Sequence, residues 1–112
     1  MNLKISALEY VQEVQNGNIS AEDFVSKTLE QIQTVDDKLH AFLSVNEKAI
    51  EQAKLIDKKI KSGDKVGSCF GMPISIKDNL CIKDNITTCA SKMLEHFVAP
   101  YDATVITKLK QE

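Results

Sequence analysis

The sequence predicts an α/β fold in which helices pack on a few strands of an incomplete mixed sheet. Two observations indicate this class. Apolar residues recur at helical spacing in several separate segments, and short apolar runs of strand length lie between those segments. The expected order is therefore helix, helix, short strand, helix, strand, loop, helix, which is an α/β pattern.

The first expected helix begins at Ser6. Ser6 and Glu9 have the spacing of a capping box, and Gly17 suits the position just after the helix end. Three residues at helical spacing form its predicted apolar face: Leu8, Val11 and Val14.

The second expected helix follows Ser20, an N-cap residue. Glu22 and Asp23 stand in its first turn, where the helix dipole favours negative charge. The polar run 36–38 is expected to end this helix. Its predicted buried stripe consists of Phe24, Thr28, Ile32 and Val35, with Val25 and Leu29 beside it.

A short strand and a third helix are expected in the middle of the chain. Residues 41–45 form an apolar run that is more strand-like than helical, and Asn46 is expected to cap the helix after it. Lysines cluster on the outer side of this helix. A membrane-surface helix would carry such a cluster, but interspersed acidic residues favour a solvated face. The opposite side carries Ala49, Ile50, Ala53, Ile56 and Ile60.

The next strand is expected over residues 73–77, after a loop that ends at Gly71. In it Ile74 and Ile76 point to one side, and Ser75 and Lys77 to the other. Apolar residues show little periodicity over residues 80–100, so we expect this segment to be loop-rich. It is expected to contain a short strand at 80–82 and a turn at 84–85, and the segment 87–91 is expected to return toward Lys77. Asp102 is the predicted N-cap of a last helix bearing Val105, Ile106 and Leu109.

Length and composition argue against several classes of function. The 112 residues leave room for one small domain, and 43% hydrophobic content is ordinary for a globular chain. The net charge is −2 and all 14 basic residues are lysines, which argues against a surface dedicated to nucleic acid. The three cysteines and two histidines lack the spacing of metal ligands, so we expect no metal site.

Lys77 is the candidate catalytic residue. It closes an apolar strand that follows a glycine turn, and Asp78 and Asn79 come directly after it. A lysine that loses solvent at the end of a buried strand favours its neutral form, which can act as a base. Most such lysines only mark where a strand meets water. The flanking pattern singles out Lys77, and its amine is expected to face a cleft.

Three blocks carry a resemblance to the amidase signature family. They are residues 71–79, residues 87–91 (Thr-Thr-Cys-Ala-Ser) and residues 100–104 (Pro-Tyr-Asp-Ala-Thr). With the amino-terminal helices they extend the resemblance over essentially the whole chain. Within the family the sequence is most similar to the glutamine-hydrolysing subunits of tRNA amidotransferases. The resemblance implies that residues 1–112 are the amino-terminal part of a single domain with the amidase signature fold.

The resemblance also implies a chemistry. Family members cleave amides with a serine nucleophile, a second serine that bridges, and a lysine, which Lys77 matches. Asp78, Asn79 and Ser91 would lie near that lysine, with Ser91 holding the amine rather than acting as the nucleophile. Both family serines belong to a glycine- and serine-rich block after the lysine, and no glycine follows Lys77 in this sequence. We therefore expect a chain truncated before that block and inactive on its own.

For the complete protein, the resemblance implies a cytoplasmic subunit that releases ammonia from glutamine. Its partners would be subunits B and C, and tRNA would be bound through the complex rather than through this segment. ATP and Mg²⁺ would serve the complex in amidating Glu-tRNA or Asp-tRNA. This sequence has no G-x-x-x-x-G-K-[ST] phosphate loop, so we expect it to bind no cofactor and no membrane.

Two other interpretations stay open. The sequence could belong to a stand-alone amidase that acts on small amides. It could also be a non-catalytic helical interaction module, in which case replacing Lys77 in a longer chain would leave amide hydrolysis untouched.

Overall fold

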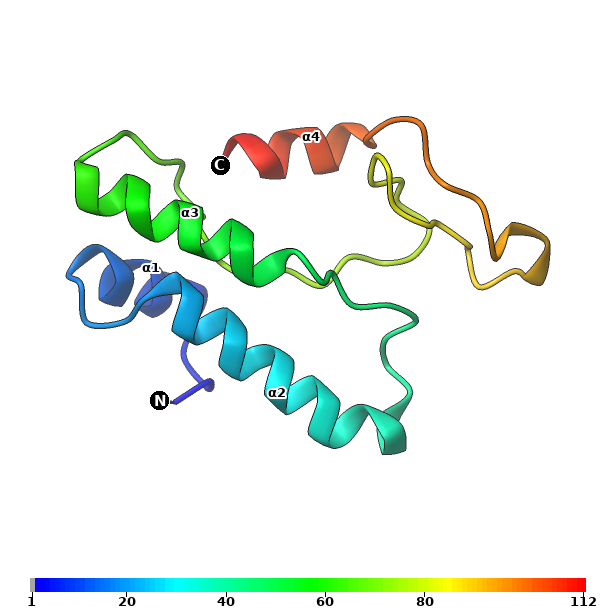
Figure 1. Ribbon diagram of the computed structural model, residues 1–112, viewed down its shortest axis with the longest axis horizontal. Helices are drawn as coiled ribbons and strands as arrows, with labels where there is room; N and C mark the ends of the chain where they lie inside the picture. The colour runs from blue at the N-terminus through cyan, green and yellow to red at the C-terminus, as the bar shows by residue number, and fades with distance from the viewer. Residues whose placement is uncertain (1) are drawn as a thin grey trace. The chain divides into compact units, whose positions relative to one another are not determined.

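Four α-helices and one short 3-10 helix make up the regular structure of the computed structural model, which describes residues 2–112 (Figure 1). They are α1 (Ala7–Gln15), α2 (Ala21–Leu39), α3 (Ala49–Ser62), η1 (Lys92–Leu94) and α4 (Thr104–Gln111). The chain divides into two compact units, Met1–Pro73 and Ile74–Glu112. The first unit contains α1, α2 and α3, and the second contains η1 and α4.

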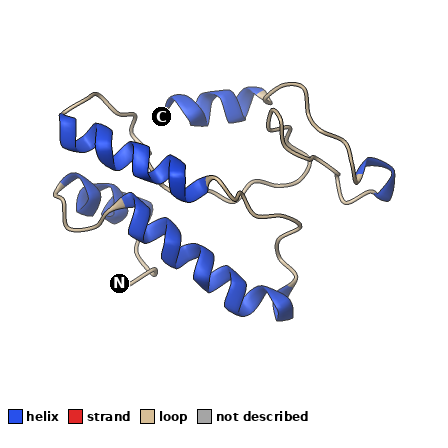
Figure 2. Cartoon of the chain, in the orientation of Figure 1, coloured by secondary structure: helices blue, strands red, loops and turns tan. Residues whose placement is uncertain are grey.

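The expected mixed sheet is absent from residues 2–112, which contain no β-strand (Figure 2). The strands predicted at 41–45, 73–77 and 80–82 are therefore wrong for this part of the protein. An extended segment becomes a strand only when its N–H and C=O groups pair with a neighbouring segment. Within the described residues the nearest approach to such pairing is one isolated antiparallel bridge, between Ile86 and Val98.

Helix α1 begins as the sequence predicts, and it buries the predicted face except at Leu8. The Ser6 side chain accepts a hydrogen bond from the Glu9 N–H, and the Glu9 carboxylate accepts one from the Ser6 N–H, so the capping box is confirmed. Leu8, expected on the apolar face, is 68% exposed. Val14 is buried as predicted, Val11 packs against the same core, and Tyr10, four residues before Val14, is buried beside them. An aromatic ring with a polar tip thus takes the place predicted for a leucine.

Tyr10 is at the centre of the first unit's main core. Its side chain is 1% exposed, and its ring centroid lies 4.6 Å from that of Phe24. The hydroxyl donates a 2.8 Å hydrogen bond to the carbonyl oxygen of Gly71. Burial first, and the charge of Asp57 second, raise the pKa of Tyr10 to about 12, so the hydroxyl keeps its proton and remains a donor. The residues of this core are Tyr10, Val14, Phe24 and Phe70.

The start of α2 is capped from two directions. The N-cap Ser20 accepts a hydrogen bond from the Asp23 N–H, as predicted. The Asp57 carboxylate of α3 accepts the N–H groups of Ala21 at 2.8 Å and Glu22 at 3.0 Å. These three N–H groups would otherwise lack intrahelical partners, and a negative charge at this end also complements the helix dipole. Asp57 therefore fastens α3 to the first turn of α2, with which α3 packs (Figure 1).

Removing this tertiary cap is expected to destabilise the first unit. We expect Asp57→Ala to lower the free energy of unfolding by about 2 kcal/mol, because two charge-assisted hydrogen bonds are lost at once. Urea denaturation followed by circular dichroism measures the change. Glu51→Ala on the exposed part of the same helix is the control, with an expected effect of about 0.5 kcal/mol or less. Equal effects from both substitutions would contradict the capping role of Asp57.

Helix α2 runs past its predicted end. The run 36–38 does not break it, and the helix continues to Leu39 before His40 adopts a left-handed backbone with φ of 50°. The Asp36 carboxylate accepts the N–H groups of Ala41 at 2.8 Å and Phe42 at 3.3 Å. Asp36, which was expected to break the helix, thus binds the backbone of the two residues that follow the C-cap.

Helix α3 buries its predicted side, but Asn46 is not its N-cap. Lys48 has that position without a side-chain hydrogen bond. Asn46 instead accepts the Lys48 N–H at 3.0 Å, which makes a local turn two residues earlier. The predicted apolar residues pack against the cores, which confirms the stripe: Ala49, Ile50, Ala53, Ile56 and Ile60.

The second unit is mostly loop, which confirms the prediction for residues 80–100 (Figure 2). Two of its segments face each other. Thr87 N–H donates to the Phe97 carbonyl at 3.0 Å, and Ala99 N–H donates to the Asn85 carbonyl at 2.9 Å. Three buried residues mark its small interior: Thr87, Ala99 and Ile106. Among the described helices of the chain, none has both the length and the apolar character needed to cross a membrane.

Candidate active site

Lys77 lies on an irregular segment between two turns of the chain. Residues 72–77 are neither helical nor paired as a strand, and the Leu80 N–H donates to the Lys77 carbonyl at 3.1 Å to close the following turn. The Lys77 side chain is exposed. Within residues 2–112, none of the ion pairs or side-chain hydrogen bonds of the structure involves its amine. The residue is thus open to groups outside the described part of the chain.

Asp78 joins the lysine segment to the block 87–91. Its carboxylate accepts the Thr88 N–H at 3.1 and 3.2 Å, and also accepts a hydrogen bond from the Thr88 hydroxyl. Its carbonyl oxygen accepts the Cys89 N–H at 2.8 Å. The prediction that the block 87–91 returns toward Lys77 is therefore confirmed. The carboxylate that follows Lys77 in sequence is bonded to Thr88, not to the lysine amine.

The block has an unusual backbone. Cys89 and Ala90 have φ of 50° and 55°, so two adjacent residues with side chains lie in the left-handed region. This conformation costs an L-residue roughly 1–2 kcal/mol. The backbone groups around it are held, because the Ala90 N–H donates to the Thr88 hydroxyl oxygen at 3.0 Å and the Ser91 N–H donates to the Thr88 carbonyl at 2.9 Å.

The other two candidate neighbours of Lys77 make different contacts. The Ser91 hydroxyl accepts the Met93 N–H at 3.3 Å and so caps η1. Asn79 is exposed. The structure thus brings Asp78 to the block, and it gives Ser91 a local capping bond. Sequence reasoning did not select Thr88, because a threonine ten positions from its carboxylate partner leaves no local pattern.

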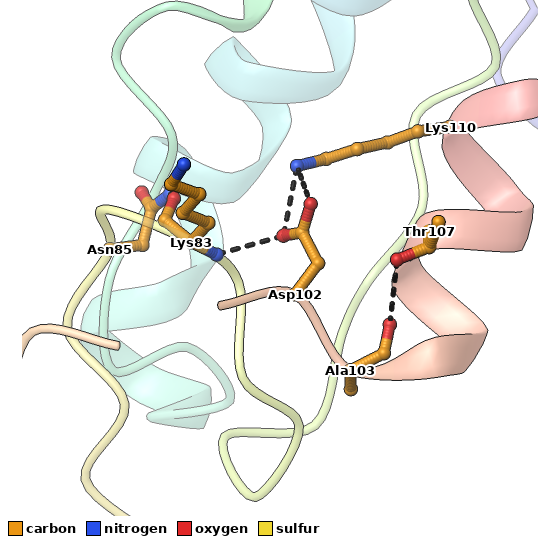
Figure 3. Close-up of polar contacts among 6 residues, drawn as sticks. All are labelled: Lys83, Asn85, Asp102, Ala103, Thr107 and Lys110. Atoms are coloured by element: carbon orange, nitrogen blue, oxygen red, sulfur yellow. Dashed lines mark hydrogen bonds and ion pairs between the residues drawn. The ribbon is translucent and has the colours of Figure 1, made fainter. Parts of the chain in front are cut away.

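Asp102 ties the start of α4 to the loop that follows the lysine segment (Figure 3). It was predicted as the N-cap, but Ala103 has that position and no side chain caps the helix. The Asp102 carboxylate instead accepts the Lys83 N–H at 2.8 Å and the Lys110 ammonium at 2.7 and 2.9 Å. Beside it, the Ala103 N–H donates to the Cys81 carbonyl at 2.8 Å. The carboxylate thus bonds to another segment of the chain rather than to the first turn of its own helix.

Acid is expected to release this contact. The hydrogen bond from Lys110 first, and that from the Lys83 N–H second, hold the pKa of Asp102 below its ordinary value of 3.8. A lowered pKa in the folded chain contributes stability above the unfolded pKa, and this contribution is lost as pH falls through the folded value. The Lys83 amide resonance should therefore shift with a midpoint below that ordinary value.

The Lys110 side chain supplies the control for that titration. Lys110→Met should move the midpoint upward, because the larger cause of the lowered pKa is gone. Lys108→Met, which changes another lysine of α4, should leave the midpoint unchanged. A Lys83 amide that does not report an acid transition would contradict the assigned contact.

The chain matches the family described as Amidase over residues 23–112, a range that includes Lys77 and the block 87–91. The chain therefore belongs to the amidase family.

Two relatives within this family are similar to the chain over most of its length. The chain is 49% identical over 107 residues to the A subunit of the glutamyl-tRNA(Gln) amidotransferase of Cenarchaeum symbiosum (strain A), covering 96% of this chain and 22% of that protein. It is 47% identical over 91 residues to the protein of the same name from Trichormus variabilis, covering 80% of this chain and 19% of that protein. The chain thus spans about a fifth of the length of these curated relatives, and corresponds to their amino-terminal portion.

A solved structure contains a chain with a similar fold. It is described as "An unexpected vestigial protein complex reveals the evolutionary origins of an s-triazine catabolic enzyme". One of its chains aligns with a TM-score of 0.88 and 26% identity, over 95% of this chain and 24% of that chain. The amidase fold expected from the sequence is therefore supported, although residues 2–112 themselves are helix and loop.

Proposed function

We propose that this chain is the lysine-bearing amino-terminal portion of a glutaminase subunit of a tRNA amidotransferase. The observation that carries the proposal is the 49% identity to the glutamyl-tRNA(Gln) amidotransferase protein of Cenarchaeum symbiosum over 96% of the chain. The family match includes Lys77, and the structure leaves the lysine side chain exposed. The loss of solvent expected around Lys77 is not found within residues 2–112, and we propose that the rest of the complete protein supplies it.

In the proposed reaction, a serine hydroxyl attacks the side-chain amide carbon of glutamine. A base takes the hydroxyl proton and passes it to the amide nitrogen, so that the C–N bond breaks and ammonia leaves. Water then cleaves the acyl ester to give glutamate and the free serine. Lys77 is the proposed base, acting through a bridging serine, and backbone N–H groups hold the oxyanion. Neither serine is assigned within residues 1–112. Ser91 is proposed as a nearby supporting residue and not as the nucleophile.

The proposal extends to the complete protein and its surroundings. Residues 1–112 would be part of a single cytoplasmic amidase domain, whose mixed sheet is completed by strands from the rest of that protein. Subunits B and C would be its partners, and they would bring tRNA to the complex. We assign ATP and Mg²⁺ to those partner subunits, because residues 1–112 carry no phosphate-loop motif.

A chimera tests the proposal. Residues 1–112 would replace the matching amino-terminal segment of the Cenarchaeum symbiosum protein, and ammonia release from glutamine would be measured in the assembled complex. We expect activity close to that of the parent protein. The 112-residue chain alone, assayed in parallel, should release no ammonia. A folded chimera without activity would contradict the proposed function.

The solved structure favours a second candidate, a fragment of an amidase that acts on small amides. Its chain has the same fold, and its description concerns an s-triazine catabolic enzyme rather than tRNA. The lower identity of 26%, against 49% for the amidotransferase relative, places this candidate second. A complete protein containing this chain that hydrolyses small amides but gives no tRNA amidation with subunits B and C would favour it.

A further inference from the structure

Asp78 and Thr88 form the most extensive side-chain contact in the loops around Lys77. The Asp78 carboxylate binds both the N–H and the hydroxyl of Thr88. The Thr88 hydroxyl oxygen in turn accepts the Ala90 N–H at 3.0 Å. One threonine hydroxyl thus links the carboxylate next to the lysine with the left-handed turn of the block 87–91.

The chemistry of the two side chains makes this contact strong and specific. An ionised carboxylate only accepts hydrogen bonds, and a hydroxyl can donate one while it accepts another. Hydrogen bonds to a charged acceptor are roughly twice as strong as those between neutral groups. The backbone supplies a further bond, from the Cys89 N–H to the Asp78 carbonyl. Together these bonds hold Cys89 and Ala90 in a conformation that they would otherwise leave.

The contact also engages the carboxylate that follows Lys77 in sequence. Asp78 follows Lys77 directly, yet none of the ion pairs within residues 2–112 joins them. Thr88 holds that carboxylate in a different contact.

We propose that Asp78 and Thr88 are positioning residues, which form a clamp that fixes the main chain after Lys77 to the block 87–91 and so orients the lysine for amide hydrolysis. The catalytic part of this inference rests on the proposed function. The clamp itself is a property of the 112-residue chain, so the two can be tested separately.

The first experiment measures the clamp by amide hydrogen exchange of the 112-residue chain. Thr88→Val keeps the shape of the side chain but removes its hydroxyl, and we expect the Ala90 N–H to exchange about tenfold faster, as the loss of one hydrogen bond predicts. Thr88→Ser should restore slow exchange. Thr107→Val is the matched control, because that hydroxyl bonds only to the Ala103 carbonyl at the start of its own helix (Figure 3). Unchanged exchange in Thr88→Val would overturn the clamp.

The second experiment measures positioning in the chimera. Thr88→Val should lower kcat for glutamine at least tenfold with KM changed less than twofold, and Thr88→Ser should recover most of kcat. Thr107→Val should leave both constants unchanged. If Thr88→Val unfolds the second unit, Asp78→Asn takes its place with the same measurements. Faster exchange with an unchanged kcat would overturn the positioning role. A wild-type chimera that is inactive while the exchange results hold would overturn the proposed function and leave the clamp as structure alone.

Discussion

Gly71→Ala is expected to destabilise the first unit by roughly 3 kcal/mol. Gly71 has φ of +67°, which costs a residue with a side chain roughly 1–2 kcal/mol. An added Cβ would also stand 2.8 Å from the Ala21 Cβ and 3.1 Å from the Ile56 Cγ2. Ala21 cannot withdraw easily, because it is fully buried and its N–H is bound to Asp57. Overpacking of this kind adds about 1–3 kcal/mol.

Thermal unfolding of the 112-residue chain measures this effect. A loss of about 3 kcal/mol should lower the Tm by roughly 12–24 °C for a unit of this size. Gly63→Ala is the matched control, since Gly63 has φ of +75° but nothing lies within 4 Å of its added Cβ. It should cost only the conformational part, roughly 1–2 kcal/mol. Equal losses of stability in the two variants would show that close packing around Gly71 does not contribute to the effect.

A double substitution separates the two causes at Gly71. Ala21→Gly removes the atom that the new Cβ would meet most closely, so the pair Ala21→Gly and Gly71→Ala should cost less than the sum of the single changes. Additive losses would contradict a direct clash between these positions.

Lys77→Ala is expected to lower kcat for glutamine hydrolysis in the chimera by roughly 10³-fold, the contribution usual for a positioned base. Lys77→Arg should fail as well, because a guanidinium stays charged and cannot take a proton. Ammonia release measures both. Lys92→Ala changes an exposed lysine of the same unit and should leave the rate unchanged.

The Lys77 result also decides between the interpretations of the sequence. If Lys77→Ala kept more than about a tenth of the rate, Lys77 could not be the base whose loss is expected to cost at least 10²-fold. The chain would then be better described as a non-catalytic helical module. Folding of the variant is checked by its Tm, which should stay unchanged because the Lys77 side chain is exposed.

The sequence by itself determined the features that depend on near neighbours. The capping box of Ser6 and Glu9, the N-cap Ser20 and the apolar stripe of α3 all arise from spacings of a few residues, and the structure has each of them. The family resemblance was read from local blocks in the same way, and the match over residues 23–112 bears it out. The assignment of Lys77 as the base rests on that resemblance and stays a prediction.

Only the tertiary structure decided which distant residues contact one another in the core. The hydrogen bond from Tyr10 to Gly71 joins residues 61 positions apart, and that from the Ala21 N–H to Asp57 joins residues 36 positions apart. Local periodicity reports which side of a helix is apolar, but it cannot report which distant group meets it. For that reason Leu8 was expected in the core where Tyr10 lies.

The same limit applies to the strands and to the candidate site. A strand is formed only when a partner pairs with it, so the apolar runs 41–45 and 73–77 suggested strands that residues 2–112 do not form. The contact of Asp78 with Thr88 crosses ten positions of irregular chain. The sequence predicts that Asp78 and the block 87–91 lie near Lys77. It does not predict that the Thr88 hydroxyl joins them, because a hydrogen bond between two loops depends on the path of the folded backbone.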